Sequence, residues 1–187
     1  QLQYPLVIKP RKSSGSRGIR IVYEKDKLED IYMDIHKKYP FPIIQEYIGI
    51  GDRYDVCLLF NSHSKLMASF AQKELRHFPV DIGPSTVQES VLAPELVQKS
   101  ISLMEKLNWQ GIVELEFMVD SRDGKAKLME INPRFWNSLY LSIISGVDFP
   151  WLLYCTVMQK DFEGVFEYKT GVKCKWTLPG DILHFIA

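Results

Sequence analysis

A chain of 187 residues with 46% hydrophobic and 25% charged residues has the composition of a folded globular protein that can bury a core. Lysine and arginine balance aspartate and glutamate at 23 each, so the overall charge predicts neither a nucleic-acid partner nor binding to a membrane surface. The three cysteines form no CxxC pair and no apolar run reaches ~18 residues, which favours a reduced, cytoplasmic protein without a membrane span.

The first part of the chain predicts a small unit of three strands and one helix. Residues 4–8 and 19–23 are strand-like and flank a Gly/Ser-rich turn, and residues 42–48 form a third short apolar segment. Residues 25–39 carry apolar side chains at helical spacing. The first strand begins almost at residue 1 with no earlier element to pair with it. We therefore expect this chain to be a fragment of a longer protein, truncated at its N-terminus.

A larger unit is predicted beyond the flexible joint Gly49-Ile50-Gly51, and a polar loop is expected over residues 76–86. Its predicted strands are residues 53–61, 65–74, 111–120, 126–131 and 173–178, and its predicted helices are residues 94–107, 137–145 and 150–159. The first four strands form two hairpins, the second turned by Asp123-Gly124. Helices mixed with antiparallel hairpins predict an α+β fold, with a small lobe over residues 1–48 and a large lobe over residues 49–187.

The turn after the first predicted strand contains residue types that bind phosphate. Lys9 ends the strand, and Gly15 and Gly18 allow backbone N–H groups to approach phosphate oxygens closely. No helix follows the glycines, so the segment matches neither the Walker pattern nor the dinucleotide fingerprint. By itself, the segment fits an ordinary hairpin loop equally well.

A more specific group of polar residues lies on the second hairpin of the large unit. Glu114 and Glu116 alternate onto one face of their strand, and pairing through the turn places Glu116 close to Glu130. Two carboxylates and the Asn132 amide oxygen are ligands that Mg²⁺ prefers, and Arg134 can bind a phosphate. The alternative is a set of solvated strand acids, one of which pairs with Arg134.

These features occur in an order that resembles the ATP-grasp superfamily over nearly the whole chain. The lysine strand, the Gly-rich loop, the hinge strand at residues 43–48 and the Glu116 to Arg134 group all follow that pattern. Within the superfamily, Gly83–Thr86 and Ser145–Asp148 are most similar to the carbamoyl phosphate synthetase large subunit and related predicted ATP-dependent carboligases. The resemblance implies an ATP-grasp fold with a nucleotide cleft between two lobes.

The resemblance also implies roles for individual residues. It assigns ATP binding to Lys9, Ser13, Ser14, Gly15, Ser16, Gly18, Gln45, Glu46, Ile48, Asp52, Met118 and Met129. It assigns the metal to Glu116, Glu130 and Asn132, with Mg²⁺ expected and Mn²⁺ as an alternative. It assigns a catalytic role in phosphoryl transfer to Lys9 and Arg134, and Arg76 would bind a carboxylate or the acyl phosphate. Ser138 stands where biotin carboxylase has a glutamate, which disfavours biotin carboxylation.

The implied activity is that of an ATP-dependent carboxylate–amine ligase. Mg-ATP would activate an unidentified carboxylate as an acyl phosphate, which an amine or another nucleophile then attacks. Two alternatives stay open, a nucleotide-binding module without catalysis and a kinase for a small metabolite, and a homo-oligomer is compatible with either. His77 is a candidate base or a solvated loop residue, while Trp136, Tyr140 and Trp151 are expected in the core.

Overall fold

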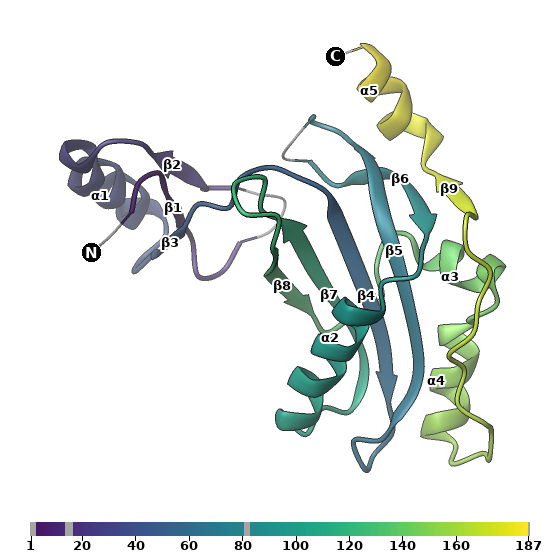
Figure 1. Ribbon diagram of the computed structural model, residues 1–187. Helices are drawn as coiled ribbons and strands as arrows, with labels where there is room; N and C mark the ends of the chain where they lie inside the picture. The colour runs from purple at the N-terminus through teal and green to yellow at the C-terminus, as the bar shows by residue number, and fades with distance from the viewer. Residues whose placement is uncertain (1–2, 14–16, 81–82, 187) are drawn as a thin grey trace.

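The computed structural model describes residues 3–13, 17–80 and 83–186, which form a small lobe beside a larger one (Figure 1). The two lobes contain separate sheets, one of three strands and one of six. Helices and antiparallel strands are mixed in both, which confirms the predicted α+β class. The phosphate-loop residues Ser14, Gly15 and Ser16, for which ATP contacts were predicted, lie outside the described residues.

The small lobe is a three-stranded antiparallel sheet with one helix. Its elements are β1 (Leu6–Lys9), β2 (Arg20–Val22), the 3-10 turn η1 (Lys25–Lys27), α1 (Leu28–Lys38) and β3 (Ile43–Glu46). β1 is the central strand and pairs with β2 and β3, both of which follow it in the chain, so the predicted unit of three strands and one helix is present. Leu6 and Ile8 alternate onto the face that packs with Val22 and with Ile35 of α1.

The large lobe is built on a six-stranded sheet in the order β8-β7-β4-β5-β6-β9, in which neighbouring strands are antiparallel. Its strands are β4 (Arg53–Phe60), β5 (Leu66–His77), β6 (Ser85–Ser90), β7 (Gly111–Val119), β8 (Ala126–Asn132) and β9 (Lys173–Lys175). Its helical elements are α2 (Pro94–Lys106), α3 (Leu139–Ser145), α4 (Phe149–Val157), the wide turn η2 (Thr177–Asp181) and α5 (Ile182–Ile186).

The central strands of this sheet are covered on both faces. On one face, Val56, Leu58 and Phe60 of β4 pack in the cluster that contains Met104 of α2. On the other face, a cluster joins the sheet to α3 and α4 (Figure 1); its buried members are Cys57, Leu59, Ala68, Phe70, Trp136, Leu141, Val147, Phe149 and Leu152. β4 therefore reads as a continuous apolar run rather than an alternating one.

Three aromatic residues expected in this core have different environments. Trp136 is buried and contacts Phe149 edge to face, as expected. Tyr140 and Trp151 are 63% and 54% exposed, so the prediction is wrong for both. The cause is helical geometry: on α3 and α4 the inward positions are taken by Leu141 and Leu152, which turns the neighbouring side chains outward.

The predicted polar loop over residues 76–86 is wrong at both of its ends. β5 continues to His77, and β6 begins at Ser85 and runs to Ser90, a strand that was not predicted. Ser85, Thr86, Gln88 and Ser90 are buried despite their polarity. A polar segment becomes an interior strand because β5 and β9 pair with it on both sides, which a local pattern does not reveal.

Neither a disulfide nor a single membrane-spanning helix occurs in the described part of the chain. Cys57, Cys155 and Cys174 are free. α3 and α4 reach the length and apolar character of a span only when taken together across a bend of 90°. The last predicted strand is shorter than expected, because β9 ends at Lys175 and the chain then turns into η2 and α5.

Candidate functional site

The β7–β8 hairpin carries the predicted carboxylates in the expected register. Glu116 lies directly opposite Glu130, and Glu114 lies opposite Asn132. Directly opposed residues of neighbouring antiparallel strands project from the same face of a sheet. All four side chains therefore belong to the face that also carries α3 and α4. The pairing predicted from alternation and the turn is confirmed.

Asn132 and Arg134 connect these acids. The Asn132 Nδ2 donates to Glu116 Oε1 at 2.6 Å and to Glu114 Oε2 at 3.2 Å, while its Oδ1 accepts from Arg134 Nη2 at 3.1 Å. Arg134 also lies 3.9 Å from Glu114 and is 57% exposed at its side chain. The amide of Asn132 thus orients two carboxylates, and Arg134 is the exposed cation beside them.

Two further acids, which the sequence did not single out, belong to the same face. Asp55 of β4 lies opposite Glu116, and Glu74 of β5 lies opposite Arg53. A row of cross-strand neighbours therefore runs from β8 to β5; in order it is Glu130, Glu116, Asp55 and Gln72. Strands β4 and β7 are far apart in sequence, so no local signal could have placed Asp55 in this row.

Gln72 ties this row to the helical layer. It is buried, and its Nε2 donates to Asp55 Oδ2 at 2.7 Å and to Ser138 Oγ at 2.5 Å. Ser138 is also buried and precedes α3. Ser138 stands where biotin carboxylase has a glutamate, and Gln72 connects the Ser138 hydroxyl to Asp55 of the acid row.

The acids raise one another's pKa values. Burial and the neighbouring charge of Glu116 raise the pKa of Glu114 to about 8, against the lowering effects of Arg134 and Asn132. Burial, with the charges of Glu74 and Glu130, raises the pKa of Glu116 to about 7. Burial, followed by the charges of Glu74 and Glu114, also raises the pKa of Asp55 well above its usual range. Burial and mutual repulsion therefore favour the protonated form of these carboxyls, and a bound cation would favour the charged form.

These oxygen donors fit a divalent cation that takes most of its ligands from water or from a bound substrate. In the described residues, no three Asp, Glu, His or Cys side chains already converge on one point as a preformed metal cage. Mg²⁺ commonly binds through one or two carboxylates together with water and substrate phosphates. Glu116 and Glu130 supply two hard oxygen donors of that kind. The metal role of Asn132 stays a prediction, since its oxygen bonds to Arg134.

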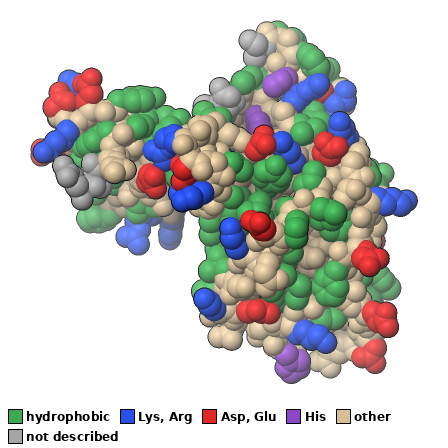
Figure 2. All heavy atoms as spheres, in the orientation of Figure 1, with side chains coloured by type: hydrophobic (Ala, Val, Ile, Leu, Met, Phe, Trp, Pro, Cys, Tyr) green, Lys and Arg blue, Asp and Glu red, His purple; other side chains and the backbone are tan. Residues whose placement is uncertain are grey.

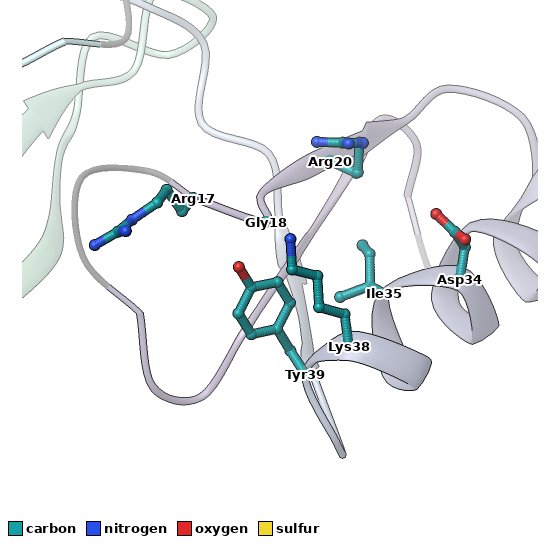
Figure 3. A pocket seen from close by; sticks show the side chains of 7 residues that line it. All are labelled: Arg17, Gly18, Arg20, Asp34, Ile35, Lys38 and Tyr39. Atoms are coloured by element: carbon teal, nitrogen blue, oxygen red, sulfur yellow. The ribbon is translucent and has the colours of Figure 1, made fainter.

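The predicted phosphate-binding segment of the small lobe is described on both sides of its glycine-rich turn. Lys9 is the last residue of β1, and Ser13 Oγ donates to the carbonyl of Arg17 at 2.7 Å. A hollow of about 220 Å³ lies beside this segment (Figure 3); it is lined by Arg17, Gly18, Arg20, Asp34, Ile35, Lys38 and Tyr39. Lys9 and the acids of the β7–β8 hairpin do not line this hollow, and Gly18 is the predicted ATP contact that does.

The predicted base-binding residues lie at the connection between the lobes. Gln45 and Glu46 end β3, and Ile48 lies just before the Gly49-Ile50-Gly51 joint. Asp52 begins the large lobe, and its carboxylate pairs with Lys73 Nζ at 2.7 Å. Their contacts with ATP stay predictions.

The two methionines predicted to cover the base lie on the β7–β8 hairpin. Met118 is on the same strand face as Glu116, two residues away. Met129 lies at a bulge, because Glu130 pairs with Glu116 while Leu128 pairs with Phe117. The contact of either methionine with the base stays a prediction.

Arg76, the predicted carboxylate-binding residue, already holds a carboxylate. Its Nη1 lies 3.1 Å from Asp181 Oδ1, and its guanidinium lies 4.5 Å from the centre of the Phe185 ring. Burial raises the pKa of Asp181, but hydrogen bonds from Arg76 and Lys175 bring that pKa below its usual value. His77 is not a solvated loop residue, because it ends β5 and its Nε2 lies 2.6 Å from Glu74 Oε2.

Comparison with known proteins gives a consistent family. A family model described as the ATP-grasp domain matches residues 1–138. Acetyl-CoA carboxylase 1 of Oryza sativa subsp. japonica is 27% identical over 137 residues, which are 70% of this chain and 6% of that enzyme. The carbamoyl phosphate synthase arginine-specific large chain of Bacillus subtilis strain 168 is 23% identical over 141 residues, which are 72% of this chain and 13% of that one.

A solved structure shows the same fold. It is the biotin carboxylase domain dimer of Hydrogenobacter thermophilus 2-oxoglutarate carboxylase, in complex with MgADP, ADP and bicarbonate. The match has a TM-score of 0.72 at 18% identity and covers 91% of this chain and 40% of that chain. The chain thus spans 6% and 13% of the two sequence relatives and less than half of the solved chain.

Proposed function

The chain belongs to the ATP-grasp family, as its motifs indicated, and on this basis we propose that it forms the nucleotide-binding part of an ATP-dependent ligase. The observation that carries the proposal is the concentration of uncompensated carboxylates beside Arg134 on one sheet face. Burial, followed by the charges of neighbouring acids, raises the pKa values of Glu114 and Glu116 there, and Arg134 supplies too little positive charge to offset the rise. A cation bound with a nucleotide would supply that charge.

Mg²⁺ is the metal that this site is best suited to bind. Glu116 and Glu130 would hold it, with Asn132 as a further donor, and Mn²⁺ accepts the same oxygen ligands. When bound, the ion would neutralise charge on the phosphate oxygens of ATP. The solved structure of the related Hydrogenobacter domain contains MgADP, which supports the same pairing of metal and nucleotide here.

The chain's own residues would mainly position ATP and stabilise the negative charge of its phosphates. Lys9, at the end of β1, and Arg134, after β8, would bind phosphate oxygens from the two lobes. The joint after Glu46 would contact the adenine through its backbone. A bound cation would favour the deprotonated carboxylates on this face, since burial and neighbouring acids otherwise raise the pKa of Glu116 to about 7 and that of Glu114 to about 8.

The reaction that we propose is activation of a carboxylate by ATP. The carboxylate oxygen attacks the γ-phosphorus of ATP, the bond to the β–γ bridging oxygen breaks, and ADP leaves. The resulting acyl phosphate is attacked by an amine or another nucleophile, and inorganic phosphate departs. Several relatives are named as carboxylases, and bicarbonate is therefore one of the carboxylates to be tested.

A calorimetric titration with ATP, with and without Mg²⁺, tests the nucleotide site directly. We expect Mg²⁺-dependent binding that is lost in a Glu116→Ala/Glu130→Ala variant. Glu105→Gln, on the exposed surface of α2, is the matched control and should bind ATP like the unchanged protein. Metal-independent binding, or full binding by the double variant, would contradict the assignment.

Positional isotope exchange tests the acyl phosphate. With ATP labelled at its β–γ bridging oxygen, a carboxylate acceptor that forms an acyl phosphate reversibly should promote scrambling of the label before any nucleophile is added. A stable phosphorylated product would instead indicate a small-metabolite kinase. ATP binding without acceptor-dependent turnover would indicate a nucleotide-binding module.

A further inference from the structure

The connection between the lobes lies directly against the turn that joins β7 to β8 (Figure 1). Val119 N donates to the carbonyl of Asp52 at 2.7 Å, and Ser121 N donates to the carbonyl of Gly49 at 3.3 Å. Gly49 N in turn donates to Asp120 Oδ1 at 3.2 Å. The joint is therefore hydrogen-bonded along its length to the end of the strand that also carries Glu116.

This approach is so close that the positions of Gly49 and Gly51 leave no room for a side chain. A Cβ at Gly49 would lie 2.4 Å from Ser121 Oγ and 2.9 Å from Asp120 Oδ1. A Cβ at Gly51 would lie 2.2 Å from the carbonyl oxygen of Val119. The Gly-Ile-Gly sequence, which looked like a flexible hinge, instead allows tight contact between the two backbones.

One arginine completes the contact and links the two lobes. Arg122 grips the buried carboxylate of Asp120 in a bidentate manner, with Nε–Oδ1 at 2.9 Å and Nη2–Oδ2 at 2.6 Å. The same Nη2 lies 2.9 Å from Glu46 Oε1. Figure 2 shows acidic and basic side chains gathered where the small lobe meets the large one. Asp120 belongs to the large lobe, whereas Glu46 is the last residue of β3 in the small lobe.

We propose that Arg122 is a positioning residue that holds the end of β3 and the interlobe joint in register for the base of the nucleotide. This inference rests on the proposed function, because the joint matters to a ligand only if ATP binds there. Arg122 does not need to touch ATP. It acts through Glu46 and Asp120, and through them it fixes the backbone from which the base would be recognised.

Arg122 should therefore affect the base end of the ligand and not the phosphate end. The phosphate end depends on Lys9, Arg134 and the carboxylates, which lie elsewhere on the two lobes. ATP and inorganic tripolyphosphate, both with Mg²⁺, share the phosphate chain but differ in the base. Comparing their affinities separates a positioning role from a general loss of structure.

We expect Arg122→Met to weaken Mg-ATP binding about tenfold and Mg-tripolyphosphate binding by less than about twofold. In turnover assays, KM for ATP should rise while kcat changes less. Glu46→Ala removes the exposed partner and leaves the buried Asp120 paired, so it tests the link even if Arg122→Met fails to fold. The double variant should bind ATP no more weakly than Arg122→Met alone, because both changes break one link.

Lys127→Met is the matched control in the same hairpin. It removes the pair between Lys127 and Asp123, 3.3 Å apart, without touching the joint, and should leave both affinities unchanged. Equal losses for ATP and tripolyphosphate in the Arg122 variant, or unchanged ATP affinity, would overturn the inference. If the unchanged protein binds neither ligand, the proposed function itself fails. If the Glu116→Ala/Glu130→Ala variant loses ATP binding as expected but Arg122→Met binds ATP like the unchanged protein, only the positioning role is rejected.

Discussion

The two ends of the β7–β8 hairpin carry acids in opposite electrostatic situations. At the turn, Asp120 is buried but gripped by Arg122, which lowers the pKa of that carboxyl below its usual range. Further along β7, burial and then the neighbouring acids raise the pKa values of Glu114 and Glu116 to about 8 and about 7. The acid at the turn is paired with an arginine that stabilises the joint, whereas the acids where a ligand would bind have too few cations beside them.

This difference separates a structural acid from a functional one. A buried carboxylate without a cation costs free energy, and a fold retains such groups mostly where a ligand compensates for them. Arg134 alone cannot balance the set, since it is exposed and lies 3.9 Å from Glu114. Changes at the acid end should therefore alter activity and metal response, and changes at the turn should alter stability and lobe geometry.

The largest expected effect is on turnover. Glu130→Gln removes one of the two proposed metal carboxylates from an exposed strand position, so we expect the loss of at least about 100-fold in acceptor-dependent ADP release. The melting temperature should stay close to that of the unchanged protein. Steady-state kinetics and a thermal melt together check this expectation, and full turnover would remove Glu130 from the site.

A smaller effect is expected on the pH dependence of stability. Glu114 and Glu116 have folded pKa values above their ordinary value of 4.5, so the unfolded chain releases their protons first as the pH rises. Their contribution to stability is present below about pH 4.5 and is lost as the pH rises to about 8. We expect the melting temperature in EDTA to fall by about 5 °C between pH 5.5 and pH 8.

Mg²⁺ should reverse this trend, because it binds the deprotonated carboxylates. Melts with 5–10 mM MgCl₂, about the concentration that weak carboxylate sites need, should show larger stabilisation at pH 8 than at pH 5.5. A Glu114→Gln/Glu116→Gln variant is the control, and its melting temperature should depend much less on pH and on Mg²⁺. A melt of the unchanged protein that stabilises steadily up to pH 8 in EDTA would contradict the raised pKa values.

Two glycine substitutions test how tightly the joint packs against the turn of the β7–β8 hairpin. Gly51→Ala forces a Cβ against the Val119 carbonyl, so we expect it to destabilise the fold by several times as much as Gly124→Ala. Gly124 has a φ of +68° with open space around its Cβ position, and its replacement costs about 1 kcal/mol. Denaturant unfolding of the two variants measures the difference, and equal costs would show that the joint can move away from the hairpin.

The smallest expected effect is at the surface of the same turn. Asp123→Asn weakens the pair with Lys127, whose side chains are 38% and 32% exposed. Exposed ion pairs contribute little to stability, so we expect a change of about 1 °C or less in the melting temperature. A large change would mean that the turn is held by Asp123 and Lys127 as much as by Arg122.

Much of the fold and of the acid site could be predicted because the relevant signals are local. Hairpin register follows from alternation and a short Asp-Gly turn, and this placed Glu116 beside Glu130 correctly. Long helices such as α2 follow from periodic apolar residues. β6 was missed because its residues are polar, and the buried position that makes it a strand is imposed by β5 and β9.

The sequence by itself determined the family, the α+β class and the hairpin that carries Glu114, Glu116, Glu130 and Asn132. The tertiary structure alone decided that Asp55 and Glu74 join these acids, because β4 and β5 meet β7 through pairing between distant segments. It also decided that Arg122 spans from Asp120 to Glu46. Local patterns are encoded by neighbours in sequence, whereas charge balance depends on which distant strands and turns come together.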